Sequence, residues 1–116
     1  MFRHRLSLAL VLLFTLWGCH SERIVAVTAG RAVPPTAAFT WSCTSWTCAF
    51  NSTGDPGSAP ITSWTWLFGD GTQGTGASPT HVYAATPGMR QYTVTLAVGD
   101  GMFERSTSHT VTATPP

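Results

Sequence analysis

The sequence predicts an all-β fold, a two-sheet β-sandwich of about seven short strands that follows an N-terminal signal segment. Apolar and polar residues alternate in several short stretches, and turn-forming residues separate these stretches. Only 9% of the 116 residues are charged, Lys is absent, and Thr, Ser, Gly and Pro supply most of the polarity. This composition favours strands and turns over surface helices, which are usually rich in Lys and Glu.

The N-terminal segment combines Arg3 and Arg5 with an almost wholly apolar run over residues 6–16. A helix of that length covers about 16 Å, whereas the hydrocarbon core of a bilayer is about 30 Å thick. The run is therefore too short to span a membrane. It predicts a secretory signal peptide, which we place over residues 1–18.

The apolar run ends in Leu16-Trp17-Gly18-Cys19, which resembles the lipobox of bacterial lipoproteins. Trp17 departs from the motif, because a small or branched residue is usual there. The resemblance implies cleavage before Cys19 and a diacylglycerol on its thiol, and hence a membrane anchor. The alternative is ordinary signal cleavage with a free Cys19. His20 stands where an Asp retains lipoproteins at the inner membrane in some Gram-negative bacteria, which favours the outer membrane or the cell surface.

Residues 19–35 mix polar and small side chains and end in Pro34-Pro35. This composition is typical of a linker, so we predict a lipid-anchored flexible tether over residues 19–35 and a folded domain over residues 36–116. From Cys19 onward the chain has four Arg and five acidic residues. Such a charge does not favour nucleic acid as a partner. We expect a monomer.

Two alternating stretches, residues 37–43 and 47–51, flank a short turn and predict a β-hairpin. Cys43 and Cys48 stand opposite each other across it, within reach of a disulfide. The signal peptide directs the chain to an oxidising compartment, and with Cys19 acylated these are the two remaining thiols. We therefore predict a Cys43–Cys48 disulfide. A redox or metal pair is disfavoured, because the spacing is not CxxC and no further ligand lies nearby.

The central strand is predicted over residues 61–68, where Trp64, Trp66 and Phe68 share one face. The next residues, Gly69-Asp70-Gly71, predict a tight turn, because Gly accepts positive φ and Asp bonds to its own backbone. Beyond the turn we expect a Gly-rich loop up to Pro79.

Three further strands are predicted nearer the C-terminus, at residues 81–83, 92–98 and 107–113. Asp100-Gly101 is a hairpin dipeptide between the last two. The stretch from Gly88 to Tyr92 forms a turn that we expect to present Arg90 at its tip.

Together these residues resemble the PKD (polycystic kidney disease) domain over nearly all of residues 36–113. The resemblance is carried by the central strand and its turn, by His81-Val82-Tyr83, by the alternation over residues 92–98 and by the Cys pair. It implies an immunoglobulin-like β-sandwich of extracellular type. Family members act as spacers between catalytic modules or bind proteins and polysaccharides, and none is catalytic by itself. The structural motif positions are Trp66, Phe68, Gly69, Asp70, Gly71, His81 and Tyr83.

Some PKD domains bind calcium through loop acids, but Asp55, Asp70 and Asp100 are isolated from one another in this sequence. A calcium site needs about six to eight oxygen ligands, so we expect no metal and no cofactor. Asp70 is expected to bond amides of its own turn. His81 and His109 are the domain's two histidines and no nucleophile motif accompanies them, so we expect no enzymatic activity.

The candidate binding residues are Trp41, Trp46 and Trp64, because together with Trp66 they exceed what a small sandwich core commonly uses. Exposed aromatic faces stack on sugar rings and dock on extended peptides. The same three residues also fit plain packing, and the sequence leaves both interpretations open. The predicted function is non-catalytic adhesion or interaction with an extracellular protein or polysaccharide at the bacterial cell envelope. The alternative is a purely structural spacer or a fragment of a larger secreted enzyme.

Overall fold

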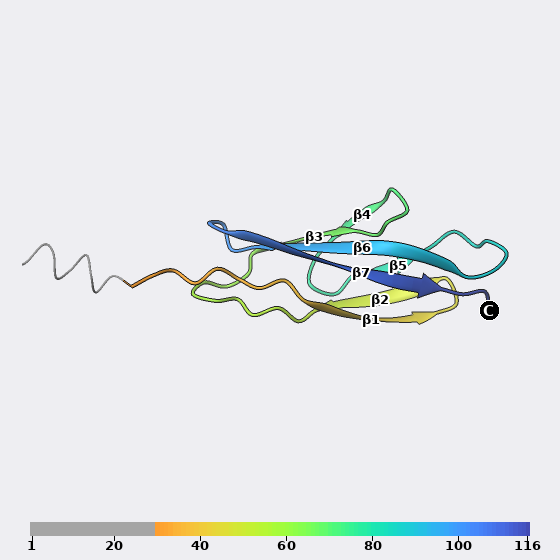
Figure 1. Cartoon of the computed structure of the whole chain (residues 1–116), viewed down its shortest axis with the longest axis horizontal. Coiled ribbons are helices and arrows are strands. Elements are labelled where there is room, and N and C mark those ends of the chain that lie inside the picture. The colour runs from red at the N-terminus through yellow and green to blue at the C-terminus, as the bar shows by residue number, and fades with distance from the viewer. Residues whose placement is uncertain (1–29) are drawn as a thin grey trace, which may run out of the picture. The chain divides into compact units, whose positions relative to one another are not determined.

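The structure is a computed structural model that describes residues 30–116. The predicted signal peptide, the lipobox with Cys19 and most of the predicted tether lie outside the described residues. Residues 32–116 form one compact unit, in which two β-sheets pack face to face (Figure 1). All of its regular structure is β-strand, so residues 30–116 contain no helix that could cross a membrane.

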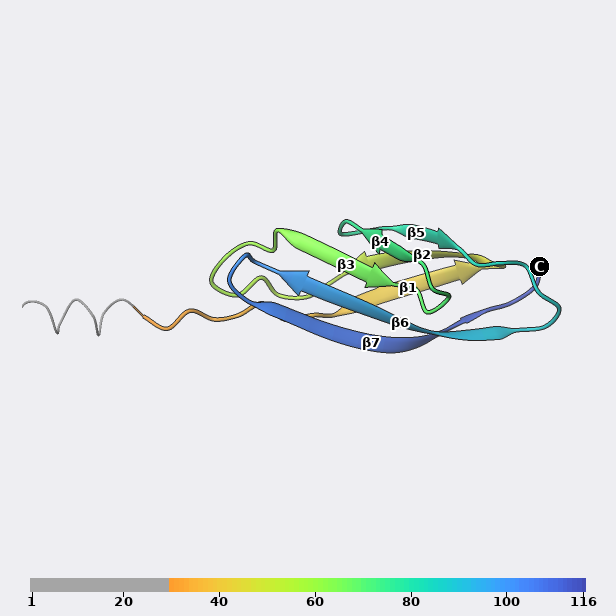
Figure 2. The same cartoon turned by 90° about the horizontal axis from the view of Figure 1, so that it is seen from above.

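The smaller sheet has three strands in the order β1-β2-β5, and the larger has four in the order β4-β3-β6-β7. Every pair of neighbours is antiparallel. Figure 2 shows β4 and β5 together at one side of the sandwich, away from β7. The predicted two-sheet sandwich of about seven strands is confirmed. Its strands are β1 (Phe39–Thr44), β2 (Thr47–Ser52), β3 (Ser63–Leu67), β4 (Gln73–Thr75), β5 (Thr80–Val82), β6 (Arg90–Gly99) and β7 (Glu104–Ala113).

The core lies between the sheets and is built from the inward-facing residues of each strand. Trp66 of β3 is its centre, fully buried, with its ring centroid 5.1 Å from that of Phe39 and 5.5 Å from that of Phe50. Its indole N–H donates to the carbonyl of Gly76 at 2.8 Å, so no polar atom of the ring is left unpaired. The buried apolar residues are Phe39, Cys48, Phe50, Trp66, Phe68, Tyr83, Val94, Leu96, Val98, Val111 and Ala113.

The end of the predicted tether packs on the sandwich. The N–H of Val33 donates to Ser58 Oγ at 2.8 Å, and the N–H of Ser58 donates to the carbonyl of Val33 at 3.0 Å. Thr36 and Asp55 form a second pair of hydrogen bonds, and Pro35 is fully buried between these contacts. The chain enters this compact unit at one end and its C-terminus lies at the other (Figure 1).

Three local predictions differ from the structure. The predicted loop after Gly71 contains β4, which has no alternating apolar signal because its central residue is Gly74, paired with Trp66. Strand β7 starts at Glu104, three residues before the predicted start, because it pairs with β6 along its full length. Arg90 is not at the tip of its turn: it begins β6 opposite Ala113, and Gly88 and Met89 precede it.

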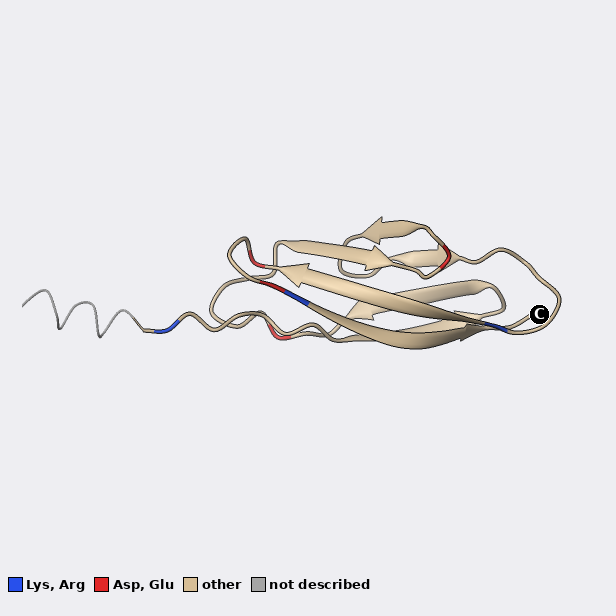
Figure 3. Ribbon diagram, turned by 45° about the horizontal axis from the view of Figure 1, so that its top comes forward, with Lys and Arg blue, Asp and Glu red and all other residues tan. Residues whose placement is uncertain are grey.

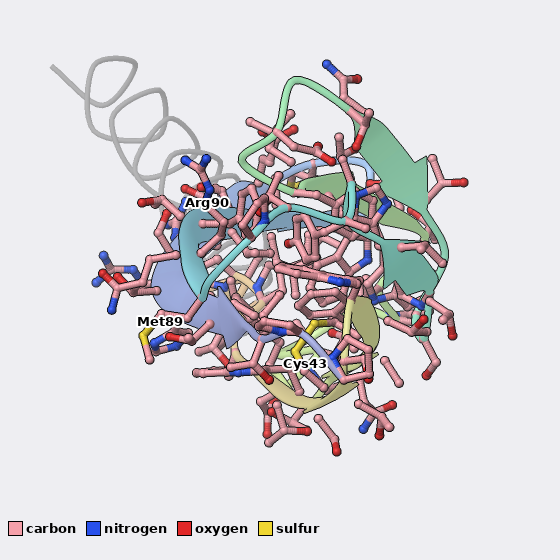
Figure 4. The ribbon with its side chains drawn as sticks, turned by 90° about the vertical axis from the view of Figure 1, so that its right-hand side faces the viewer. Cys43, Met89 and Arg90 are labelled. Carbon is pink, nitrogen blue, oxygen red and sulfur yellow. A yellow bond between two sulfur atoms is a disulfide. The ribbon has the colours of Figure 1, made fainter. Side chains whose placement is uncertain are left out.

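The predicted disulfide is present at the end of the β1–β2 hairpin. Cys43 and Cys48 are register partners with Cα atoms 4.1 Å apart, and a disulfide joins them. Cys48 is fully buried. Figure 4 views this end of the sandwich, where the disulfide lies toward the interior while Met89 and Arg90 lie at the rim.

Replacing both cysteines, as Cys43→Ala with Cys48→Ala, should lower the free energy of unfolding by about 2 kcal/mol, because the bond closes only a short loop. Urea denaturation of the oxidised protein and of the double variant measures the difference. Dithiothreitol should destabilise the wild type and leave the variant unchanged. Equal stability of the two oxidised proteins would contradict the bond's contribution.

Candidate functional site

A polar cluster joins the two sheets beside the turn after β3. The carboxylate of Asp70 accepts the backbone N–H of Thr72 at 3.0 Å and also its hydroxyl. The other carboxylate oxygen lies 2.7 Å from Nε2 of His81, which donates to it. Asp70 belongs to the turn between two strands of the larger sheet, whereas His81 lies on β5 of the smaller sheet. The predicted turn role of Asp70 is therefore present, and a bond between the sheets accompanies it.

Aromatic rings hold His81 in this position. Its ring stacks on Phe68 with centroids 4.1 Å apart and an interplanar angle of 1°, and it meets Tyr83 edge-on at 4.6 Å. The hydroxyl of Tyr83 donates to the carbonyl of Phe68 at 2.9 Å. Burial raises the pKa of Tyr83, and the charge of Asp70 adds to this. We call the set Phe68, Asp70, Thr72, His81 and Tyr83 the inter-sheet clasp.

The glycine before Asp70 is required by its surroundings. Gly69 has φ of 85°, and a Cβ at this position would lie 2.6 Å from the carbonyl oxygen of Thr93. A larger residue would be strained and would also push β6 away from the turn. The motif position Gly69 thus lets the clasp lie directly on the larger sheet.

The clasp contains an acid, a histidine and a hydroxyl, but its geometry does not support nucleophilic catalysis. A catalytic triad needs one ring nitrogen of His on the acid and the other on the nucleophile. Here Nε2 of His81 faces both Asp70, at 2.7 Å, and the Thr72 hydroxyl, at 3.3 Å. The hydroxyl itself bonds to the carboxylate. His81 is therefore held as a donor, and the arrangement stabilises the turn.

The three aspartates of the domain lie in three different loops and each serves its own turn. Asp55 accepts the N–H of Gly57 at 2.7 Å. Asp100 accepts the N–H groups of Phe103 and Met102, and these bonds lower its pKa. Within residues 30–116, no group of three or more His, Cys, Asp or Glu side chains is placed to hold a metal ion.

The tryptophans of the domain differ in their surroundings. Trp66 is fully buried, and Trp46 and Trp64 are half-buried and pack against the core. Trp41 is 37% exposed, although it shares a strand face with Phe39, which is only 5% exposed. Of the three candidate binding aromatics, the structure leaves Trp41 the most open to solvent.

Trp41 lies beside a residue that sequence reasoning did not select as a binding residue. Its ring centroid is 5.4 Å from that of His109 on β7, with an interplanar angle of 32°. Phe39 contacts both rings, at 5.6 Å from Trp41 and 4.9 Å from His109. His109 stands alone among Ser and Thr in the sequence of β7, so no local pattern marks it. The available signal was that His109 lies two residues before the buried Val111, so both side chains belong to the same strand face.

The pKa of Asp70 is lowered from its usual 3.8: burial opposes this, but the hydrogen bonds from Thr72 and His81 outweigh it. The carboxylate therefore stabilises the fold above the unfolded-state pKa, and this contribution is lost as pH falls through the folded-state pKa. We expect Asp70→Asn to be about 1–2 kcal/mol less stable at pH 7, with the gap to wild type narrowing below about pH 4.

Urea denaturation from pH 7 to pH 2 measures this gap. Thr72→Ser keeps both the amide and the hydroxyl on Asp70, so it is the matched control, and its difference from wild type should not change with pH. A gap between wild type and Asp70→Asn that is the same at pH 7 and pH 2 would contradict a stabilising carboxylate.

Comparison with known proteins gives two kinds of match. A family model described as PKD domain matches residues 31–115. The PKD1 domain of Vibrio anguillarum Epp has a TM-score of 0.67 at 23% identity, over 74% of this chain and 100% of that one. The PKD1 domain from Vibrio cholerae metalloprotease PrtV has a TM-score of 0.64 at 26% identity, over 71% of this chain and 99% of that one.

A third solved structure concerns the promiscuous specificity of carbohydrate-binding modules from the β-sandwich superfamily. It has a TM-score of 0.58 at 29% identity and covers 74% of this chain but only 36% of its own chain. The comparison with curated proteins found no match. The family model spans most of the described residues, and the two solved PKD domains have the same fold as this chain. The chain therefore belongs to the PKD-domain family.

Proposed function

We propose that this PKD domain is a non-catalytic interaction module, which a lipid on Cys19 displays at the bacterial cell envelope. The observation that carries the interaction is the exposure of Trp41 beside His109. An exposed aromatic ring offers a flat apolar face on which a sugar ring or an extended peptide can pack. Its partner is an extracellular protein or polysaccharide.

The relatives support a module without its own chemistry. PKD domains are generally non-catalytic, and one solved relative is a domain of a metalloprotease. Another similar structure concerns carbohydrate-binding modules, which favours a polysaccharide among the two partner classes. The carboxylate of Asp70, the ring of His81 and the hydroxyl of Thr72 bond to one another in the inter-sheet clasp, so they hold the turn.

The lipid anchor is supported by the sequence. The basic start, the short apolar run and the lipobox resemblance at Cys19 occur in the order that lipoprotein export requires. Two or more acyl chains hold a protein firmly, whereas one binds reversibly. His20 at the sorting position supports display at the outer membrane or cell surface.

The alternative function is a structural spacer, and one observation favours it. The chain enters the sandwich at one end and its C-terminus lies at the other (Figure 1), as a spacer between two attached parts requires. Trp46 and Trp64 also pack against the core, so most of the domain's tryptophans have structural roles. A spacer would need no ligand at Trp41.

Lipidation of Cys19 is tested in a bacterial host that processes lipoproteins. Wild-type protein should appear in the membrane fraction and incorporate a radiolabelled fatty acid, because acylation follows signal cleavage. Cys19→Ala should lose both the label and the membrane association. Cys43→Ala with Cys48→Ala is the control that should keep them. An unmodified Cys19 in the mass spectrum of the wild type would remove the anchor from the proposal.

The interaction is tested with the same cells. Cells that display the wild type should adhere to at least one immobilised polysaccharide or extracellular-matrix protein, and cells with Cys19→Ala should not. Equal adhesion of both strains to every surface would favour the spacer.

A further inference from the structure

The longest edge strand of the domain has one free side. Strand β7 is the last strand of the larger sheet, and within residues 30–116 it pairs only with β6. Its register with β6 runs from Glu104 to Ala113 without a skipped residue, so no bulge interrupts it. The opposite edge strands, β4 and β5, have three residues each and lie on the other side of the sandwich (Figure 2).

The hairpin before β7 shows which residues carry the free backbone groups. The N–H of Asp100 donates to the carbonyl of Phe103 at 3.2 Å, so these two residues form a hydrogen-bonded pair in the register of β6 and β7. Bonded and non-bonded pairs alternate along an antiparallel ladder. Every second residue of β7 therefore directs its N–H and C=O away from β6. These residues are Glu104, Ser106, Ser108, Thr110 and Thr112.

The free edge lacks the features that usually prevent pairing with another chain. Such edges commonly carry Lys, Pro or a bulge. Strand β7 has neither Lys nor Pro, and its two charged residues, Glu104 and Arg105, come first. Figure 3 shows these charges at the start of the strand and none along the rest of it. Nothing within β7 opposes the addition of a further strand.

We propose that β7 pairs with β7 of a second copy of this chain, so that the two larger sheets become one continuous sheet. This departs from the monomer expected from the sequence. A strand that pairs with itself about a two-fold axis runs antiparallel to its partner. Opposed residues must share one face of the joined sheet, so the axis passes through a residue. An axis at Ser108 or His109 gives the longest ladder.

The sequence of β7 is compatible with itself in both registers. Glu104 and Arg105 then lie opposite uncharged residues near the end of the partner's strand, so no like charges face each other. In the middle of the outer face, Ser and Thr oppose Ser and Thr. Such hydroxyls can bond across strands, as those of Thr95 and Ser108 do at 2.7 Å within one copy. Residues 30–116 hold three Arg and four acidic residues, so two copies repel each other little.

An aromatic ring beside this edge gives pairing an apolar component. Trp41 of β1 is partly exposed and contacts His109 of β7, with ring centroids 5.4 Å apart. A second copy along β7 brings its own β1 to the same side of the sandwich. Pairing therefore covers apolar surface in addition to bonding free backbone groups.

Antiparallel pairing also determines where the two copies are anchored. The chain enters the sandwich at the end where β7 begins, and β7 runs toward the other end (Figure 1). In the pair, the entry end of each copy lies beside the C-terminal end of the other. Copies anchored on two facing cells meet in this orientation, so the pair joins cells. This last step rests on the proposed display at the cell surface, whereas the pairing itself does not.

Pairing is tested on the full chain by sedimentation equilibrium in detergent of matched density. Thr110→Pro removes one outward N–H and keeps the bonds to β6, a change that edge strands tolerate. It should weaken self-association about tenfold, which corresponds to about 1.4 kcal/mol. Thr110→Ala keeps the N–H and is the matched control, which should dimerise as the wild type does.

Thermal unfolding checks that each variant is folded, and Thr110→Lys places a charge on the same edge should Thr110→Pro be unstable. A wild type that stays monomeric at every concentration would overturn the pairing, and so would a dimer unaffected by Thr110→Pro and Thr110→Lys. In either case the proposed function stands, because adhesion to immobilised surfaces tests it separately.

The joining of cells is tested with two differently labelled populations that display the chain. Wild-type cells should form mixed clumps, whereas cells with Thr110→Pro should not, and surface labelling checks display in both. Clumping that survives Thr110→Pro would overturn a role for β7. A solution dimer without clumping of cells that display it would overturn only the joining of cells. A wild type that surface labelling does not reach would contradict the proposed display.

Discussion

The burial of Trp66 between the sheets is the constraint on which the rest of the domain depends. Its ring contacts Phe39 and Phe50 of the facing sheet, and its N–H is bonded to Gly76. A shift of β3 by one residue would turn Trp66 to solvent and bring Thr65 inward, so the ring fixes the register of the central strand. The bond to Gly76 also fixes the path of the chain after β4. The clasp and the contact between Trp41 and His109 both take their positions from this arrangement.

The two sides of the sandwich are held together by different contacts. Beside β5, the clasp closes the gap with a charge-assisted bond between Asp70 and His81 that aromatic rings cover. Beside β1, no comparable bond joins the sheets among residues 30–116. There the ring of His109 on β7 packs against Phe39 and Trp41 on β1 and holds the sheets together. On the side beside β5, polar groups bond to one another between the sheets. On the side beside β1, the aromatic ring of Trp41 remains partly exposed to water.

Much of this fold could be predicted from local patterns. Alternation placed β1, β2, β3 and β6, and the opposed cysteines predicted the disulfide because both signals depend only on strand geometry. Strand β4 could not be found, since Gly74 carries no side-chain signal. The bond from Asp70 to His81 and the contact of Trp41 with His109 could not be found either. They join residues from different sheets, so they depend on how the sheets pack and not on any spacing in the sequence.

The family motif and the candidate binding residue of this domain are therefore different things. The motif residues Asp70 and His81 look chemically active in the sequence, yet each uses its polar atoms on the other or on the turn. Trp41 belongs to no motif, and its parity with Phe39 in the alternating stretch of residues 37–43 predicts that both side chains face the same way. They do so, but β1 is the edge strand of the smaller sheet, and parity alone cannot reveal that a residue lies at a sheet edge. An inward-facing position on an edge strand is where a small sandwich can expose an aromatic ring without disturbing its core.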